Sequence, residues 1–229
     1  MTGPSLRWHW LGLLPYGEAL ARQREHRRAI QAGTASEEIW LLEHPPTVTT
    51  GRRPAPGTPG RAFLAGHGVA LYATERGGLA TYHAPGQLVA YLLIDVARRG
   101  IGVRRLVECM EDAVIHWLDE QGVSAGRREG LPGVWVGSDK IAALGLHVQR
   151  GVTLHGLALN LRPDLTGFGL IVPCGVTDGG VTSLQRERGR APSPAAAAPS
   201  LGEALIKAVQ AAPAASVIAQ GRPTTNKMP

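Results

Sequence analysis

The sequence has little cysteine, few lysines and no long apolar run. Two cysteines in 229 residues cannot build the disulfide framework of a small secreted protein, and a reducing compartment suits them. No segment approaches the roughly 18 to 20 consecutive apolar residues that a membrane span requires. The N-terminal residues also lack a secretory pattern. We therefore expect a cytoplasmic protein that has no membrane partner.

Lysine is the scarcer of the two strongly basic residues. Three of the 24 basic side chains are lysines, and two of these, Lys207 and Lys227, lie near the C-terminus. The third is Lys140. Arginine keeps its proton in a protein, whereas a desolvated lysine can lose it. The contrast indicates that position 140 requires an amine, although a strand-end lysine that reaches toward water is the ordinary alternative.

The overall composition is that of a folded, basic protein. Apolar residues make up 44% and charged residues 18%, which is typical of a globular chain. The formal net charge of +6 suits an acidic partner, which for a basic protein can be nucleic acid, an anionic membrane or an acidic protein. The arginines are scattered and aromatic residues make up only 5%, so a module that binds nucleic acid is disfavoured.

Hydrophobic patterning predicts an α+β fold. Apolar segments interrupted by Gly and Pro, typical of antiparallel hairpins, fill residues 69–96 and 133–161. A basic helix is expected over residues 16–33 and a clearly amphipathic one over 103–122. Residues 51–68 are dense in Gly and Pro and are expected to form a loop. The predicted fold is therefore a mostly antiparallel or mixed sheet flanked by helices.

The two cysteines differ in their surroundings. Cys109 falls at the edge of the apolar stripe of the predicted helix, where a thiol usually acts as a small buried hydrophobe. Cys174 lies between Pro173 and Gly175, outside any periodic apolar pattern. Glycines near it allow a substrate to approach the backbone closely. A nucleophilic role for Cys174 would require a neighbouring cation or base, because an ordinary thiol has a pKa of about 8.5.

Several other polar residues carry weaker signals. In strict strand alternation, Lys140 would share an apolar face with Ala142, Leu144 and Leu146. His44 precedes two prolines and is better explained as a strand end than as a metal ligand, and His155 before a glycine is weak when taken alone. No C-x-x-C, H-E-x-x-H or phosphate-loop pattern is present, so we predict no metal, nucleotide or other cofactor.

Four segments in order resemble one family, the octanoyl-[acyl carrier protein]:protein N-octanoyltransferases, also called lipoyl(octanoyl) transferases. They are "LLEHPPTVTTGRR", "RGGLATYHAPGQLVAYLLID", "GVWVGSDKIAALGLHVQRGVTLHGLALNL" and "PCGVTDGGVTSL". Together with their spacing they cover most of residues 38–184. The resemblance implies a biotin/lipoate protein ligase-like fold and transfer of an octanoyl or lipoyl group to a lysine of a lipoyl domain.

The resemblance also assigns residues. The cysteine that carries the acyl group falls on Cys174, and the lysine that assists it falls on Lys140. The fatty-acyl pocket maps to three segments, whose members are Arg76, Gly77, Gly78, Leu79, Ala80, Thr81, Tyr82, His83, Ala143, Leu144, Gly145, Gly156, Leu157 and Ala158. This chain departs from the family pattern at Ala84, where Gly is common, and at Leu157, where Phe is common. Both changes bear on the shape of the pocket.

The resemblance implies the partners as well. The donor would be octanoyl-acyl carrier protein, and the acceptors would be lipoyl domains of 2-oxoacid dehydrogenase E2 subunits and the glycine cleavage H protein. Neither nucleic acid nor a cofactor is implied. Two rival activities remain, an ATP-dependent lipoate-protein ligase, which needs no nucleophilic cysteine, and an amidotransferase that moves the acyl group between lipoyl domains.

The chain is expected to divide into three parts. Residues 1–184 would form a single catalytic domain. Residues 185–199 are rich in Arg, Pro, Ala and Ser, which is typical of a flexible linker. In residues 200–229, Ser200 followed by Glu203 forms a capping-box pattern for a short helix, and a frayed tail would follow it.

Overall fold

A seven-stranded mixed sheet forms the centre of the protein in a computed structural model, which describes residues 5–53, 57–171 and 179–212. The first two strands in the sheet order pair in parallel, and the remaining neighbours are antiparallel. In sheet order the strands are β1 (Arg7–Leu13), β2 (Glu38–Glu43), β6 (Gln87–Leu93), β10 (Val152–Asn160), β9 (Asp139–Gln149), β8 (Leu131–Val136) and β7 (Gly126–Arg128).

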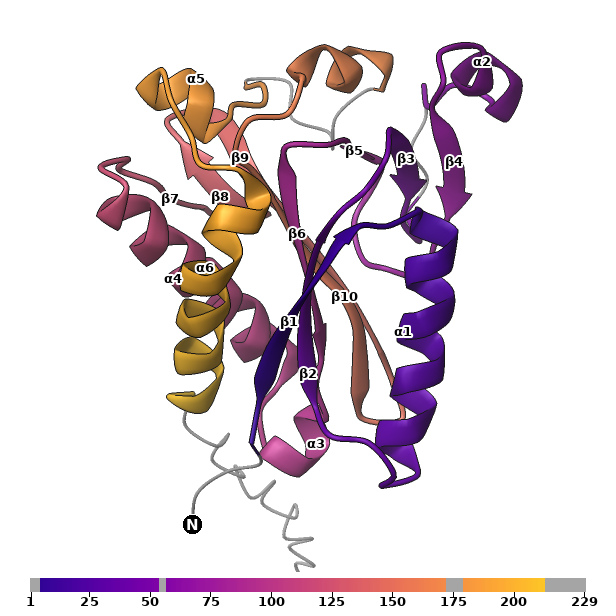
Figure 1. The fold of residues 1–229 in the computed structure, drawn as a ribbon, viewed down its shortest axis with the longest axis vertical. Helices are drawn as coiled ribbons and strands as arrows, with labels where there is room; N and C mark the ends of the chain where they lie inside the picture. Colours follow the sequence, from indigo (N-terminus) through magenta and orange to yellow (C-terminus); the bar gives the residue numbers. More distant parts are fainter. Residues whose placement is uncertain (1–4, 54–56, 172–178, 213–229) are drawn as a thin grey trace, which may run out of the picture.

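A smaller three-stranded sheet lies beside one end of the large sheet (Figure 1). Its order is β4 (Ala70–Ala73), β3 (Thr47–Thr50) and β5 (Thr81–His83). Val48, Leu64, Tyr82 and Phe168 form a small core that joins it to helix α2 (Arg61–Gly66) and to a 3₁₀ helix, η1 (Leu165–Leu170). The expected loop over residues 51–68 is therefore wrong at its end, because residues 61–66 form α2 and bury Leu64.

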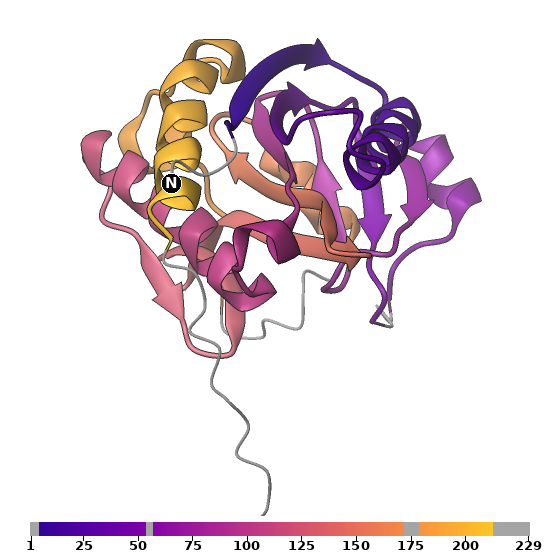
Figure 2. The ribbon, with the colours of Figure 1, turned by 90° about the horizontal axis from the view of Figure 1, so that it is seen from below.

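Helices cover both faces of the large sheet (Figures 1 and 2). α1 (Tyr16–Gln31) packs on one face over a small core that includes Leu42, Val89 and Leu154. α4 (Val103–Glu120) and α6 (Pro194–Gln210) pack on the other face over the main core. Two short helices complete the described chain, α3 (Val96–Arg99) and α5 (Leu184–Arg188). No helix in residues 5–53, 57–171 or 179–212 is long and apolar enough to cross a bilayer.

The predicted amphipathic helix over residues 103–122 is confirmed as α4. It buries Leu106, Met110 and Trp117 against the sheet. Cys109 is 1% exposed on the same helix, and burial raises the pKa of its thiol. The structural role expected for Cys109 therefore fits its position, because a desolvated thiol is a poor nucleophile.

The expected flexible linker over residues 185–199 is largely helical. α6 begins at Pro194, where the Ser193 hydroxyl accepts a hydrogen bond from the Ala196 N–H. Proline suits the first turn of a helix and alanine is the best helix former, so the composition that indicated a linker also favours a capped helix. Ser200, the expected N-cap, lies inside α6 and accepts a hydrogen bond from the Trp117 indole on α4. Residues 213–229, the expected tail, lie outside the described residues.

Candidate active site

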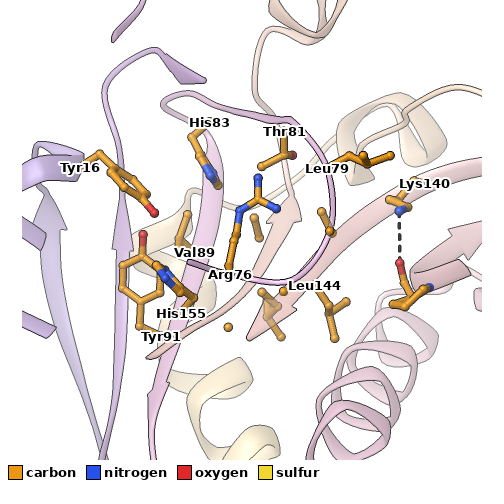
Figure 3. Close-up of a pocket in the computed structure, with 17 residues that line it drawn as sticks. Tyr16, Arg76, Leu79, Thr81, His83, Val89, Tyr91, Lys140, Leu144 and His155 are labelled. Atoms are coloured by element: carbon orange, nitrogen blue, oxygen red, sulfur yellow. Dashed lines mark hydrogen bonds between the residues drawn. The ribbon is translucent and has the colours of Figure 1, made fainter. Parts of the chain in front are cut away.

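A cavity of about 610 Å³, open solvent included, lies over β6, β9 and β10 beneath the segment that joins β4 to β5 (Figure 3). Its floor contains small residues from two adjacent strands, Ala143 and Gly145 on β9 and Gly156 and Ala158 on β10. Their size leaves room between the sheet and the covering segment. A Cβ atom at Gly145 would lie 2.9 Å from the Gly77 carbonyl oxygen, so this position requires glycine.

The covering segment is fixed at both edges of the cavity. On one side, the Gly77 N–H donates to the Leu146 carbonyl of β9 at 3.0 Å. On the other, the Arg76 guanidinium donates to the backbone oxygen of Thr49 at 2.7 Å and to its hydroxyl at 2.9 Å. Arg76 is only 9% exposed, so these contacts replace most of its hydration. The covering segment is therefore anchored to both β9 and β3.

Lys140 reaches the cavity because β9 contains a β-bulge. Val134 of β8 pairs with Ala142 and the next residue, Trp135, pairs with Lys140, so Ile141 is an extra residue. Ile141 and Ala142 both enter the main core, whereas Lys140 and Ala143 line the cavity. The expectation that Lys140 shares a face with Ala142 is therefore wrong, since a bulge breaks the alternation of side chains.

The Lys140 amine contacts a backbone carbonyl and an aromatic ring. Nζ donates to the Pro132 carbonyl at 3.1 Å (Figure 3) and lies 4.6 Å from the centroid of the Trp135 ring. Both contacts favour a positive charge, because the carbonyl accepts a hydrogen bond and the ring face attracts a cation. The lysine therefore has a defined position at the edge of the cavity.

A short segment after β10 lies alongside Lys140. The Lys140 N–H donates to the Gly180 carbonyl and the Thr182 N–H donates to the Lys140 carbonyl, both at 3.0 Å. The Asp139 carboxylate accepts the Gly180 N–H at 2.8 Å. These contacts fix residues 180–182 against β9. A second cavity, of about 470 Å³ with open solvent included, is lined here by Lys140, Trp135, Ile171, Gly179 and Val181, among others.

A series of hydrogen bonds through buried side chains runs from the first cavity to the second. The His83 ring donates from Nδ1 to Gln87 Oε1 at 2.7 Å. The Gln87 amide donates to Asn160 Oδ1 at 2.8 Å, and the Asn160 amide donates to the Thr182 carbonyl at 3.0 Å. Burial lowers the pKa of His83 to about 3, so the ring is neutral at neutral pH. These hydrogen bonds therefore fix Thr182, and with it the segment beside Lys140, without adding charge.

Residues 15–206 match the model of the lipoyl protein ligase A/B catalytic domain. An octanoyltransferase of Chloroflexus aggregans is 47% identical over 195 residues, which cover 82% of this chain and 87% of that relative. The chain belongs to the octanoyltransferase family. Among solved structures, a bi-partite lipoate protein ligase from Thermoplasma acidophilum aligns with a TM-score of 0.62 at 18% identity. A lipoate-protein ligase A bound with ATP aligns with a TM-score of 0.59, also at 18% identity.

These two structural alignments cover 91% of this chain each, and 82% and 84% of the respective solved chains. At such low identity the likeness concerns the fold alone. It confirms the predicted α+β fold class and its likeness to the fold of the lipoate ligases. The family resemblance inferred from the four sequence segments is also confirmed, because the curated relative covers most of both chains.

The structure of this octanoyltransferase-family chain brings most of the predicted pocket residues together. The first cavity is lined by Arg76, Gly78, Leu79, Thr81, His83, Ala143, Leu144, Gly145, Gly156, Leu157 and Ala158. Ala80 lines the second cavity instead. Two predicted residues line neither cavity. Gly77 donates its backbone N–H to the Leu146 carbonyl, and Tyr82 packs on Phe168 with 5.4 Å between the ring centroids. Cys174 lies outside the described residues.

Sequence reasoning missed the aromatic end of the first cavity. Tyr16 of α1, Tyr91 of β6 and His155 of β10 all line it. The His44 ring, behind them, donates to the Leu14 carbonyl and accepts from the Tyr91 hydroxyl, each at 2.6 Å. Burial lowers the pKa of His44 to about 4 and raises that of Tyr91 far above its usual value, so both stay neutral. His44 is thus a buried structural group, and no three His, Cys, Asp or Glu side chains cluster as metal ligands among the described residues.

Proposed function

We propose that this chain transfers an octanoyl group from acyl carrier protein to a lysine of a lipoyl domain, through a thioester on Cys174. Membership of the octanoyltransferase family supports the acyl transfer itself. Acceptors in this proposal are the lipoyl domains of 2-oxoacid dehydrogenase E2 subunits and the glycine cleavage H protein. The T. acidophilum ligase was described together with its E2 lipoyl domain, which supports an acceptor of this kind.

One observation carries the assignment of the site. Ile171 and Gly179, the described residues that flank the segment containing Cys174, both line the second cavity, and so does Lys140. Cys174 is the third residue after Ile171, and an extended chain spans at most about 3.6 Å per residue, or about 11 Å over three residues. Because the described residues on both sides of the segment line the cavity that contains the amine, this connectivity supports the proposed pairing of Cys174 with Lys140.

The first step forms the acyl-enzyme. The Cys174 thiolate attacks the carbonyl carbon of the octanoyl thioester, the bond from that carbon to the carrier sulfur breaks, and the carrier leaves as a thiol after taking up a proton. A charged Lys140 nearby would favour the thiolate by opposite-charge attraction. The acyl tail would lie in the first cavity, between the covering segment and the small residues of β9 and β10.

The second step delivers the acyl group. The amine of the lipoyl-domain lysine attacks the thioester carbon, the bond to Cys174 breaks, and an amide forms. The attacking nitrogen must lose a proton, and a neutral Lys140 would accept it as a general base. Exchange between thioesters is nearly balanced and conversion of a thioester to an amide is downhill, so the reaction needs no ATP.

Intact-mass measurement after incubation with octanoyl-acyl carrier protein tests this proposal. We expect one octanoyl adduct on the wild-type chain and on Cys109→Ala, and none on Cys174→Ala. Absence of an adduct on the wild type, or an adduct that persists in Cys174→Ala, would contradict the thioester mechanism. Retained transfer by Cys174→Ala from free octanoate and ATP would instead indicate a ligase, and transfer from an octanoylated lipoyl domain alone would indicate an amidotransferase.

A further inference from the structure

Buried nitrogens that lack hydrogen-bond partners gather at one place in the described part of the chain. Seven such side-chain atoms occur there, and Arg105 Nε is the one that lies apart. The others belong to Gln23, Arg27, His147 and His155, which we call the polar end. Because a buried polar group without a hydrogen-bond partner is unfavourable, such a concentration points to a ligand or ordered solvent.

His155 connects the polar end to the first cavity. It is 2% exposed, it lines the cavity, and neither ring nitrogen has a hydrogen-bond partner. Its backbone has a φ of 65°, a left-handed conformation that is rare outside glycine. On β10, Leu159 lies four residues after His155 and enters the main core, so regular alternation would send His155 there too. The unusual backbone instead turns the ring toward the cavity (Figure 3).

The rest of the polar end stands behind this ring. Gln23 of α1 accepts the His155 backbone N–H at 2.9 Å through Oε1, so its unpartnered nitrogen is a donor. Arg27 lies one turn further along α1 and is 8% exposed, with two unpartnered guanidinium nitrogens. His147 of β9 pairs with Leu154, the residue before His155. The unpartnered nitrogens of Gln23 and Arg27 can only donate, so they favour a ligand that accepts hydrogen bonds.

Glu75 does not satisfy the His155 ring. Its carboxylate is held by Arg24, whose Nη2 donates to both oxygens at 3.1 Å. His155 Nε2 lies 3.9 Å from the nearer oxygen, which is too long for a hydrogen bond. Burial lowers the pKa of His155 and of His147, so both rings are neutral at neutral pH. A neutral imidazole has one donor and one acceptor nitrogen, and a hydroxyl group can pair with either of them, because it can both accept and donate a hydrogen bond.

The walls of the cavity change character along its length. Leu79, Leu144, Leu157 and Val89 supply apolar surface, and Lys140 and His155 appear on opposite sides of it (Figure 3). An acyl chain that enters from the Lys140 side meets apolar groups first and the His155 ring last. Each further methylene pressed against that ring would place apolar surface against polar groups without supplying a hydrogen bond, which is unfavourable.

We propose that the polar end selects acyl chains by their far terminus, with His155 binding a terminal hydroxyl group and disfavouring apolar chains that are long enough to reach it. This inference rests on the proposed function, because it places the acyl tail in the first cavity. His155 makes the direct contact, since it alone of the four polar-end residues lines that cavity. The substrate class is therefore medium-chain ω-hydroxyacyl thioesters, in addition to plain octanoyl.

The test compares plain and ω-hydroxy acyl groups of about eight, ten and twelve carbons on acyl carrier protein. The measured quantity is kcat/KM for formation of the acyl-enzyme. In the wild type we expect the hydroxyl to raise kcat/KM roughly three- to tenfold at the length that reaches His155, as one hydrogen bond allows. In His155→Leu that ratio should fall to about one, and plain long chains should react faster.

Two further variants serve as controls, one for misfolding and one for the loss of an unrelated histidine. His155→Gly removes the ring while suiting the left-handed backbone, so it should fold even if His155→Leu does not. The control is His116→Leu on α4, a histidine whose side chain is 66% exposed, which should keep the wild-type ratio. The inference is overturned if His155→Gly retains the wild-type preference, or if the hydroxyl lowers kcat/KM at every length.

Failure of the proposed function gives a different result. If no acyl group is transferred from any carrier, the thioester mechanism fails, and calorimetric binding of the free fatty acids then tests the polar end alone. Tighter binding of an ω-hydroxy acid than of its plain counterpart, lost in His155→Gly, would support the inference. Equal binding of the two acids would overturn it.

Discussion

The Lys140 side and the Tyr16 side of the first cavity hold their polar groups by different means. Lys140 is a single amine at the edge, fixed by a bulge in β9, by one carbonyl and by one aromatic ring. On the opposite side, Tyr16, Tyr91 and His155 are buried. Burial raises the pKa of both tyrosines and lowers that of the histidine, so the neutral form of each is favoured. On one side the contacts of the amine favour its charged form, and on the other side burial favours the neutral form of each group.

The comparison shows how one sheet supports two chemical environments. Backbone irregularity serves both sides, through the extra residue Ile141 in β9 and the left-handed His155 in β10. Each redirects a side chain that regular alternation would bury in the main core. Substitutions at the Lys140 side should therefore affect chemistry, and those at the opposite side should affect stability and acyl selection.

The largest effect on activity is expected at Lys140. Lys140→Arg retains the positive charge that favours a thiolate but cannot supply a neutral base. We expect the octanoyl adduct to form while transfer to the lipoyl domain falls by roughly 10²- to 10⁴-fold, the usual contribution of a general base. Single-turnover measurement of the two steps would show this. Wild-type rates for both steps would show that Lys140 is not the base, and Lys140→Met should impair both.

Buried histidines beside Tyr16 should make the free energy of unfolding depend on pH. The folded pKa values of His44 and His83 are lowered to about 4 and about 3, from an ordinary value of 6.5. The unfolded chain therefore binds more protons below about pH 6.5, and the free energy of unfolding should decrease as the pH falls from there toward about 4. The two rings together contribute at most about 2.7 kcal/mol per pH unit.

Urea unfolding at about pH 7 and about pH 5 measures this slope. Replacing both rings, with His44→Gln and His83→Gln, should reduce it, whereas His116→Asn on exposed α4 should leave it unchanged. Tyr16 and Tyr91 do not interfere, because burial raises the pKa of each further above this range. An unchanged slope in the double variant would show that other groups, such as carboxylates, dominate acid unfolding.

A substitution at Gly145, where the covering segment lies close to β9, should have an intermediate effect on activity. The added methyl group of Gly145→Ala would lie 2.9 Å from the Gly77 oxygen and 3.3 Å from Arg76 Cδ. The covering segment must shift, and we expect a loss of about 1 to 3 kcal/mol in stability with a roughly tenfold lower kcat/KM. Gly126→Ala is the matched control, since its new Cβ would meet nothing within 4 Å. Equal behaviour of the two variants would show that the segment adapts freely.

The sequence predicts those parts of the site that depend on residue type. The rarity of lysine singles out Lys140, and small residues at 143, 145, 156 and 158 are compatible with a cavity beside a strand. Alternation cannot predict the bulge at Ile141 or the turned ring of His155, because both depend on pairing with neighbouring strands. Tyr16 and Tyr91 were missed for a similar reason, since they meet only after α1 packs on the sheet. The start of α6 was missed because Pro and Ala suit both linkers and helix N-termini.

The smallest effect on activity is expected at Trp135. This prediction tests whether its ring helps to place the Lys140 amine. Its ring faces the amine and is 2% exposed, and its indole N–H donates to the Leu131 carbonyl at 3.2 Å. Trp135→Phe keeps an aromatic face but weakens the attraction for a cation, which is worth about 0.5 to 1 kcal/mol when exposed. We expect kcat for octanoyl transfer to fall roughly two- to fivefold, because the amine would be held less firmly.

Trp117→Phe is the control for this change. Trp117 is a buried indole of α4 in the main core, and its N–H donates to Ser200 at a site away from both cavities. It should therefore lower stability without a matching loss in kcat. If Trp117→Phe slowed transfer as much as Trp135→Phe, the decrease would reflect general loosening of the fold. If Trp135→Phe instead retained the wild-type kcat, the bulge and the Pro132 carbonyl would be sufficient to place the amine.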